Sequence, residues 1–292
     1  ILFITLLINT SLFGQEAPTM TITASDQVGT MVTTLAGTGS LGSNNSTTGT
    51  SAGFKYPYGV AVDGSGNVYV ADGNNYSIRK ITPSGEVTTF AGSGSSGSTD
   101  ATGSSASFSN PYGVAVDGSG NVYVADGPNN KIRKITPSGE VTTLAGSGSW
   151  GFADGQGTSA SFYTPWGVAV DGSGNVYVAD MHNHSIRKIT SSGLVSTLAG
   201  TGSPGFNNST TGTSAIFDSP KGVAVDGSGN VYVADSGNDL IRKITPSGVV
   251  TTFAGSGIEG NSDGAGASAS FDTPSGVSVD GGGNVYVGDR YN

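Results

Sequence analysis

Short hydrophobic runs with a period of two residues are spread along the chain. In Gly-Val-Ala-Val-Asp, which begins at Gly59, Val60 and Val62 alternate with the small Ala61, and Asn-Val-Tyr-Val follows from Asn67. Because side chains alternate between the two sides of a β-strand, this pattern predicts short strands. Both sides of each predicted strand are apolar or small, which is typical of a sheet that is covered on both faces.

The same runs return at a nearly constant interval. Gly-Val-Ala-Val-Asp, or its variant Gly-Val-Ser-Val-Asp, starts at Gly59, Gly113, Gly167, Gly222 and Gly276, with spacings of 54, 54, 55 and 54 residues. Each complete interval adds Ile-Arg-Lys-Ile-Thr and a Val-Thr-Thr-Leu-Ala-Gly-like run, which makes four predicted strands. Two tight turns, residues 63–67 and 82–86 in the first interval, have the glycine and proline of hairpins. This order predicts an all-β fold, a β-propeller with four-stranded antiparallel blades. The rival, a parallel β-helix, has shorter coils and lacks hairpin turns.

The segment PYGVAVDGSGNVYVADGNNYSIRKI, Pro57 to Ile81, resembles the NHL repeat, and the resemblance runs from Val32 to the C-terminus. NHL propellers usually have six blades, and one blade is often closed by strands from both termini. The resemblance implies about five blades in this chain, the fifth ending after its second strand, and six in the intact protein. It also implies that an extra strand at Val32 to Gly37 is the N-terminal half of a closing blade. We therefore place a C-terminally truncated propeller at residues 31–292.

An apolar run, residues 1–13, opens the chain, and Gly14 and two polar residues follow it. The run is too short to span a bilayer comfortably and is typical of the hydrophobic region and cleavage zone of a secretory signal peptide. We predict a signal peptide at residues 1–14 that lacks its true start, and an N-terminal extension at residues 15–30. The protein is then secreted, extracellular or periplasmic, with no membrane span in the mature chain. A buried strand at residues 1–13 is the alternative.

Charge and cysteine content narrow the classes of partner. The formal net charge is −9, and the chain has only 12 lysines and arginines and no cysteine. A surface that binds a polyanion needs clustered basic residues, so nucleic acid is not expected as a partner. The absence of cysteine excludes disulfides, thiol catalysis and thiolate metal sites, and it leaves the compartment open.

Some polar residues recur in every repeat. An aspartate ends each second strand, and an arginine stands seven residues later; in the complete repeats these are Asp72, Asp126, Asp180, Asp235, Arg79, Arg133, Arg187 and Arg242. A residue that every repeat keeps most simply serves folding. We expect the aspartates, with an asparagine three residues on, to bond backbone groups of the connecting loop, and the arginines to pair with them. A ring of aspartates that binds cations is the alternative.

The turn from Asp63 to Asn67 loosely resembles the start of a calcium loop, because oxygen-bearing side chains occupy alternate positions. It lacks the later glutamate and the full number of ligands that such a loop needs. A hairpin turn with glycines at its positive-φ positions is the simpler interpretation. We therefore expect no cofactor and no metal site, with a divalent cation such as calcium as the alternative.

The positions that differ between repeats fall on one side of the predicted propeller, beside the loops between strands two and three and the long loops between blades. The candidates for recognition there are Tyr58, Tyr112, Trp166, Lys221, Tyr76, His182, His184, Asp239 and Tyr291. Binding usually resides in loops on a rigid scaffold, and tyrosine, tryptophan and lysine around one rim suit a peptide or a sugar. We therefore predict a secreted, non-catalytic scaffold that binds a protein, peptide or glycan. Trp150, Phe152 and Phe206 in the long loops are further contact candidates, with packing inside their own loops as the alternative.

A metal-dependent propeller enzyme is the competing hypothesis. Peptide-amidating lyases of the NHL group hold a metal with histidines from several blades, and gluconolactonase-type propellers bind a divalent ion around the channel. This chain has only His182 and His184, both in one loop, and no recognisable Ser-His-Asp set. Metal sites normally need three or four ligands. We therefore expect no catalytic residues, and an enzyme of the gluconolactonase or lyase kind stays open as the alternative.

Overall fold

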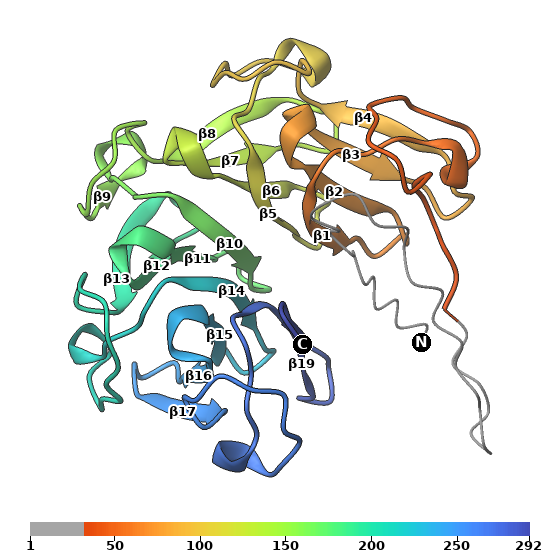
Figure 1. Ribbon diagram of the computed structural model, residues 1–292. Coiled ribbons are helices and arrows are strands. Elements are labelled where there is room, and N and C mark those ends of the chain that lie inside the picture. The colour runs from red at the N-terminus through yellow and green to blue at the C-terminus, as the bar shows by residue number, and fades with distance from the viewer. Residues whose placement is uncertain (1–31) are drawn as a thin grey trace, which may run out of the picture.

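The computed structural model describes residues 32–292, so the predicted signal peptide and N-terminal extension, residues 1–14 and 15–30, lie outside the described part. It consists of short antiparallel sheets placed side by side in an arc around a common centre (Figure 1). The strands of the first two sheets are β1 (Pro57–Val62), β2 (Val68–Asp72), β3 (Ser77–Ile81), β4 (Val87–Ala91), β5 (Pro111–Val116), β6 (Val122–Asp126), β7 (Lys131–Ile135) and β8 (Val141–Ala145).

The third sheet has a short fifth strand on its outer edge, and the last sheet has two strands. The remaining strands are β9 (Gly155–Gln156), β10 (Pro165–Val170), β11 (Val176–Asp180), β12 (Ser185–Ile189), β13 (Leu194–Ala199), β14 (Pro220–Val225), β15 (Val231–Asp235), β16 (Leu240–Ile244), β17 (Val250–Ala254), β18 (Pro274–Val279) and β19 (Val285–Asp289). We call the five sheets blades one to five. The prediction of an all-β fold with four-stranded antiparallel blades is confirmed.

Within each complete blade the strands pair in chain order, and the first strand lies innermost. The first strands of successive blades, β1, β5, β10, β14 and β18, are neighbours around the centre (Figure 1). Strand directions therefore alternate from the centre outward, which sends the two hairpin turns of a blade to one side. The loops between second and third strands lie on the other side. The long loops to the next blade start and end there, and their middle parts reach the third-to-fourth hairpin turn of that blade, where the Gly103 N–H donates to the Gly139 carbonyl.

The core lies between neighbouring blades. Val122 and Val124 of β6 pack with residues of blade one, whereas Tyr123 and Ala125 of the same strand pack with residues of blade three. All four side chains are at most 5% exposed. The period-two pattern of the sequence thus places apolar side chains on both faces of each sheet, and burial on both faces holds each blade to its neighbours.

The segment before blade one differs from its prediction. Residues 32–37 are not assigned as a strand, although Leu35 and Ala36 pack against the outer core of blade one. The Gly37 N–H donates to the Gly49 carbonyl at 3.0 Å, as the Gly92 N–H after β4 does to Gly103 at 3.1 Å. The segment therefore occupies the place of a fourth strand. It lacks ladder bonds because no third strand pairs with it among residues 32–292.

The described part contains no α-helix, only 3₁₀ turns of three residues. No helix among residues 32–292 has the length and hydrophobicity to cross a membrane.

Candidate binding face

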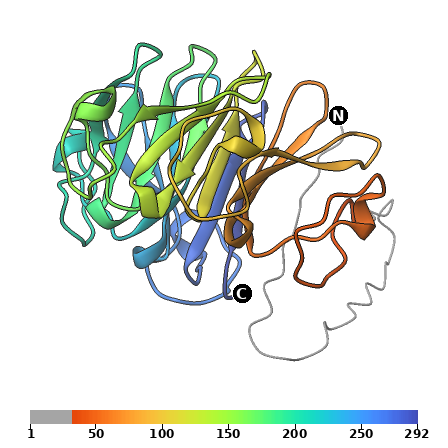
Figure 2. The ribbon, with the colours of Figure 1, turned by 90° about the horizontal axis from the view of Figure 1, so that it is seen from above.

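The two sides of the propeller differ in their variability. We call the side with the 3₁₀ turns η2 (Gly73–Asn75), η4 (Gly127–Asn129), η6 (Met181–Asn183) and η8 (Ser236–Asn238) and the long inter-blade loops the loop face. The opposite side has the hairpin turns, and Figure 2 shows the strands running between the two sides. All nine variable residues that the sequence singled out lie at or next to the loop face.

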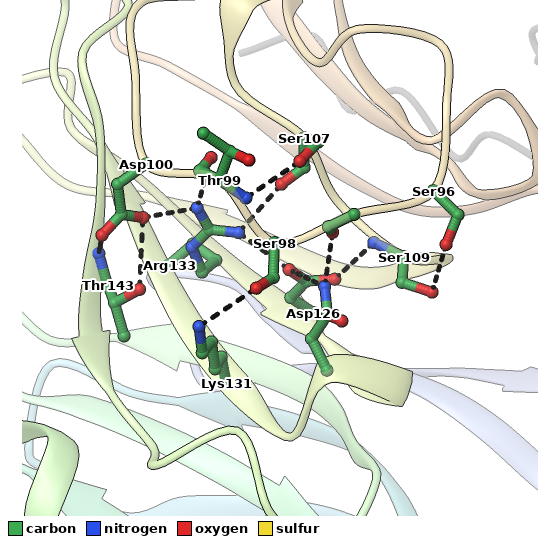
Figure 3. A network of polar contacts seen from close by, with 12 residues as sticks. Ser96, Ser98, Thr99, Asp100, Ser107, Ser109, Asp126, Lys131, Arg133 and Thr143 are labelled. Atoms are coloured by element: carbon green, nitrogen blue, oxygen red, sulfur yellow. Dashed lines mark hydrogen bonds and ion pairs between the residues drawn. The ribbon is translucent and has the colours of Figure 1, made fainter.

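A buried arginine anchors the long loop that precedes each complete blade, as Figure 3 shows for blade two. Arg133 Nη1 donates to Asp126 at 2.9 Å and to the Ser107 carbonyl at 3.0 Å, while Nη2 donates to the Thr99 carbonyl and to Asp100. Side chains of both Arg133 and Asp126 are fully buried. A buried charge is tolerable when it is paired and hydrogen-bonded, as here. The network ties the loop between blades one and two to β6 and β7.

The aspartate at the centre of this network also positions the start of the next strand. Asp126 Oδ1 accepts the N–H of Ser109 at 2.8 Å, and Oδ2 accepts the Asn129 amide at 2.9 Å. Asn129 in turn donates to the Gly97 carbonyl at 2.7 Å. The same set recurs around Asp72, Asp180 and Asp235, paired with Arg79, Arg187 and Arg242 at 2.7–2.9 Å.

We call the recurrent aspartates, asparagines and arginines of this network, with the buried loop phenylalanines, the frame. Burial raises the pKa of Asp180 to about 6, and the charge of the Arg187 guanidinium acts in the opposite direction. The recurrent loop phenylalanines are part of the same structure, because Phe108 is fully buried and its ring lies 5.1 Å from the Arg133 guanidinium carbon. Phe152 and Phe206 cover Arg187 and Arg242 from the other side, at 5.0 and 4.9 Å.

In the turn from Asp63 to Asn67, which resembles the start of a calcium loop, both carboxylate oxygens of Asp63 accept hydrogen bonds from protein donors. Asp63 Oδ1 accepts the N–H groups of Ser65 and Asn67, and Oδ2 accepts the Asn67 amide and the Tyr69 hydroxyl. Desolvation by burial, together with this carboxylate, raises the pKa of Tyr69 to about 12. The same donors surround Asp117, Asp171, Asp226 and Asp280. These contacts favour a structural role for the turn.

Four variable residues from four blades meet at the centre of the loop face. Tyr112 stacks on Trp166 with ring centroids 4.1 Å apart and planes 17° apart, and Tyr58 contacts both edge-on at 5.1 and 5.8 Å. Lys221 Nζ lies 5.8 Å from the Trp166 ring centroid. We call Tyr58, Tyr112, Trp166 and Lys221 the central cluster. The sequence predicted that they share a rim, and the structure brings them into contact.

The central cluster is positively charged. Burial lowers the pKa of Lys221, and the charge of Arg290 acts in the same direction. Arg290 also opposes the rise in the pKa of Tyr58 that burial causes. Neither Lys221 nor Arg290 forms an ion pair with a residue of the described chain. Tyr291, 64% exposed, lies beside Arg290 at 5.1 Å.

The residues that end the 3₁₀ turns connect neighbouring blades. Tyr76, Asn130, His184 and Asp239 all have a left-handed backbone, with φ between 47° and 52°. Three of them accept a backbone N–H from the next blade: Asn130 from Thr164 at 2.9 Å, His184 Nδ1 from Ser219 at 3.0 Å, and Asp239 from Thr273 at 2.8 Å. His184 and Asp239 therefore join blades at the loop face, a role that the sequence did not reveal.

His184 makes one inter-blade bond sensitive to pH. Desolvation by burial lowers the pKa of His184 from 6.5, Asp218 opposes this, and His182 adds to it. Because the folded pKa is below the unfolded one, the contribution to stability is complete above about pH 6.5 and is lost as pH falls through the folded pKa. We expect a loss of about 1 kcal/mol in the free energy of unfolding from this bond between pH 7.5 and pH 5.

Chemical denaturation across this pH range, with the wild type and His184→Asn, tests this expectation. Asparagine supplies the same acceptor without titrating, as Asn130 does one blade earlier. The difference in stability between the two proteins should change across this range. An unchanged difference would contradict the role given to His184.

A second group of aromatic side chains, separate from the central cluster, lies on the loop face of blade three. His182 Nδ1 is 3.0 Å from the Thr164 hydroxyl, and its ring lies 4.8 Å from that of Tyr163, which in turn lies 5.6 Å from Trp150. Tyr163 was not among the candidates predicted from the sequence, although the residue after the loop phenylalanine also varies between repeats. Among residues 32–292, no group of three or more His, Cys, Asp or Glu side chains is arranged to hold a metal ion.

Comparison with known proteins agrees with this architecture. The NHL repeat model matches residues 54–81, 108–135, 162–189 and 217–244, which is the first three strands of each complete blade with the loop phenylalanine before them. The chain is 32% identical over 238 residues to Protein SUPPRESSOR OF QUENCHING 1, chloroplastic, of Arabidopsis thaliana. The aligned region covers 75% of this chain and 22% of that protein. It is 28% identical over 273 residues to NHL repeat-containing protein 2 of Bos taurus, and here the aligned region covers 81% of this chain and 38% of that protein.

The chain thus spans less than two fifths of the length of these relatives. Among solved structures, an auxiliary nutrient binding protein from Bacteroides thetaiotaomicron is similar, with a TM-score of 0.63 and 19% identity over 82% of this chain and 58% of that one. At this identity the likeness shows the fold alone. From the four repeat matches, the blade structure and these relatives, we conclude that the chain belongs to the NHL-repeat family of β-propeller proteins.

Proposed function

We propose that this protein is a non-catalytic binding scaffold that recognises a protein, peptide or glycan through its loop face. The repeated residues are engaged in the frame, where the aspartates and arginines of the complete blades are buried together with Phe108, Phe162 and Phe217. The variable residues lie together on one face, and loops on a rigid frame are where propellers and other scaffolds usually bind.

The observation that carries this proposal is the central cluster. Tyr58 is 40% exposed, and Tyr112, Trp166 and Lys221 are partly exposed beside it. Tyrosine, tryptophan and a cation are the residue types that most often dominate binding energy when a partner covers them. The cluster draws one residue from each complete blade, so a ligand bound there would contact all four.

Arrays of glycans and of peptides, probed with labelled full-length chain, test this proposal. We expect the double variant Tyr112→Ala, Trp166→Ala to bind the same features at least about tenfold more weakly, because truncated interface aromatics commonly cost more than about 1.4 kcal/mol. Val62→Ala is the matched control, since Val62 is 51% exposed at the opposite end of β1. Equal binding by the double variant, or no binding by the wild type, would refute the proposal.

We also propose that the protein acts outside the cytoplasm, in the extracellular space or the periplasm, without a cofactor. Support comes from the apolar run at residues 1–13, which is typical of a signal peptide. Mass spectrometry of the N-terminus of the exported protein tests this. Cleavage after Gly14 or close to it is expected, and a cytoplasmic protein that keeps residues 1–13 would contradict it.

A further inference from the structure

One blade contains the rarest side chains of this protein. The chain has two tryptophans and two histidines, and all four, Trp150, Trp166, His182 and His184, belong to the loop face of blade three. Trp166 belongs to the central cluster, and His184 joins blades three and four. Trp150 and His182, with Tyr163 between them, serve neither purpose.

The other blades show that the frame does not require these three aromatic residues. The parallel bridges that place Trp150 beside Phe162 place Leu41, Ser96 and Pro204 beside the equivalent phenylalanines. The residues equivalent to Tyr163 are Lys55, Ser109 and Asp218, which use the same backbone N–H to bond the frame aspartate. Asn74, Pro128 and Gly237 stand in place of His182. In blade five Tyr291 stands in place of His182, so among the five blades only blade three is aromatic at all three variable positions.

The three rings form a continuous outer surface, which we call the blade-three platform. Trp150 and Tyr163 are 5.6 Å apart with planes tilted by 39°, and Tyr163 and His182 are 4.8 Å apart with planes tilted by 58°. Trp150 is 73% exposed and Tyr163 is 40% exposed. Exposed aromatic surface of this kind often marks a binding site.

The frame holds the backbone of the platform in place. Tyr163 N–H donates to the buried Asp180 at 2.8 Å, and its carbonyl accepts the His182 N–H at 3.1 Å. Beside Trp150, the Gly151 carbonyl accepts the Asn183 amide at 2.7 Å, and the Gly151 N–H donates to Phe162. Rings on such a fixed backbone lose little conformational entropy when a ligand covers them.

We infer that the blade-three platform binds a neutral sugar ring of a glycan, an inference that rests on the proposed function and assigns its ligand class and place. A pyranose has an apolar C–H face that can lie on the indole of Trp150, and hydroxyls at its edge that need polar partners. The Tyr163 hydroxyl and His182 Nε2 form no hydrogen bond within residues 32–292, so both are free to serve such hydroxyls.

Charge and ring geometry favour a neutral sugar over the other ligands. The platform contains no aspartate, glutamate, lysine or arginine, and burial lowers the pKa of His182, which favours the neutral imidazole. A proline-rich peptide would fit a slot between aromatic walls. Trp150 and Tyr163 are tilted by 39° and are not parallel walls, and Trp150 is 73% exposed, so its indole is accessible to a single ring.

Single-tryptophan variants of the full chain test the inference, because only Trp150 and Trp166 fluoresce as indoles. Trp166→Phe leaves Trp150 as the reporter, and Trp150→Phe leaves Trp166. We would titrate each with a soluble β-glucan, an α-mannan, a xylan and a galactan, with a polyuronate and a proline-rich peptide for comparison. A blue shift and quenching are expected with at least one neutral polysaccharide in Trp166→Phe, where Trp150 is the reporter, whether or not Trp166 also responds in Trp150→Phe.

Trp150→Ala should weaken binding of that polysaccharide at least about tenfold by calorimetry, whereas Leu41→Ala should not. Leu41 is the matched control, because it occupies the equivalent position in blade one and is 67% exposed. A response of Trp166 alone would overturn the platform and leave the proposed function standing. Binding of only the polyuronate or the peptide would overturn the sugar class, and binding of none of the probes would overturn the inference.

Discussion

Replacing Asp180 with alanine is expected to lower the free energy of unfolding by about 3–5 kcal/mol. The side chain is fully buried and accepts hydrogen bonds from Arg187 at 2.8 Å, Asn183 at 2.8 Å and the Tyr163 N–H at 2.8 Å. Its removal leaves the guanidinium of Arg187 buried without this carboxylate, and breaking a buried pair by removing one partner costs about this much. Urea denaturation followed by circular dichroism measures the effect.

Asp154→Asn is the control for this prediction. Asp154 is 50% exposed and bonds the same guanidinium at 2.7 Å, and asparagine already does this in other blades, where Asn45 and Asn208 bond Arg79 and Arg242. An exposed carboxylate of this kind contributes about 1 kcal/mol or less. Equal losses from the two variants would contradict the view that the buried pair, and not the outer carboxylate, anchors the loop.

Gly167→Ala is expected to destabilise the protein by about 2–3 kcal/mol. Gly167 lies in β10, where the first strands of neighbouring blades meet, and a methyl group there would overlap the carbonyl oxygen of Lys221 in the next blade. At Gly113 an added methyl carbon would stand 2.5 Å from the Trp166 carbonyl oxygen. Backbone cannot move aside as a flexible side chain can, so the blades must separate and lose packing.

Gly172→Ala separates this effect from a general intolerance of glycine replacement. An added methyl carbon at Gly172 meets no atom within 4 Å, and its φ is not positive. Thermal denaturation of the two variants should show a marked fall in melting temperature for Gly167→Ala. Gly172→Ala should melt close to the wild type, because its free energy of unfolding should change by no more than about 0.5 kcal/mol. Similar melting temperatures would show that the strands do not approach as closely as described.

The frame could be predicted from the sequence because it repeats. Recurrence alone pointed to Asp126 and Arg133 as a structural pair, and the period of two placed Tyr123 and Ala125 on one side of a strand that is covered on both. The reason for the recurrent Gly113 was not evident, because it depends on how closely two blades approach at the centre. The role of Asp100 was also hidden, since asparagine replaces it in blades one and four.

The candidate site was predicted in part. The spacing of one repeat implied that Tyr58, Tyr112 and Trp166 share a rim, and their contact follows from the small radius at which the first strands lie. The inter-blade bond of His184 could not be predicted, because it depends on a left-handed backbone, which only a few per cent of non-glycine residues adopt. Tyr163 could have been found by comparing the residue after each loop phenylalanine.

Hydrogen–deuterium exchange tests most directly whether the protein binds through its loop face. The full chain would be compared alone and saturated with the array ligand of highest affinity. We predict slower exchange at the central cluster and in residues 146–153, 160–166 and 181–185, which lie on the loop face, and unchanged exchange in the hairpin turns at residues 171–175 and 190–194. Slower exchange in the hairpin turns, with none on the loop face, would contradict the account.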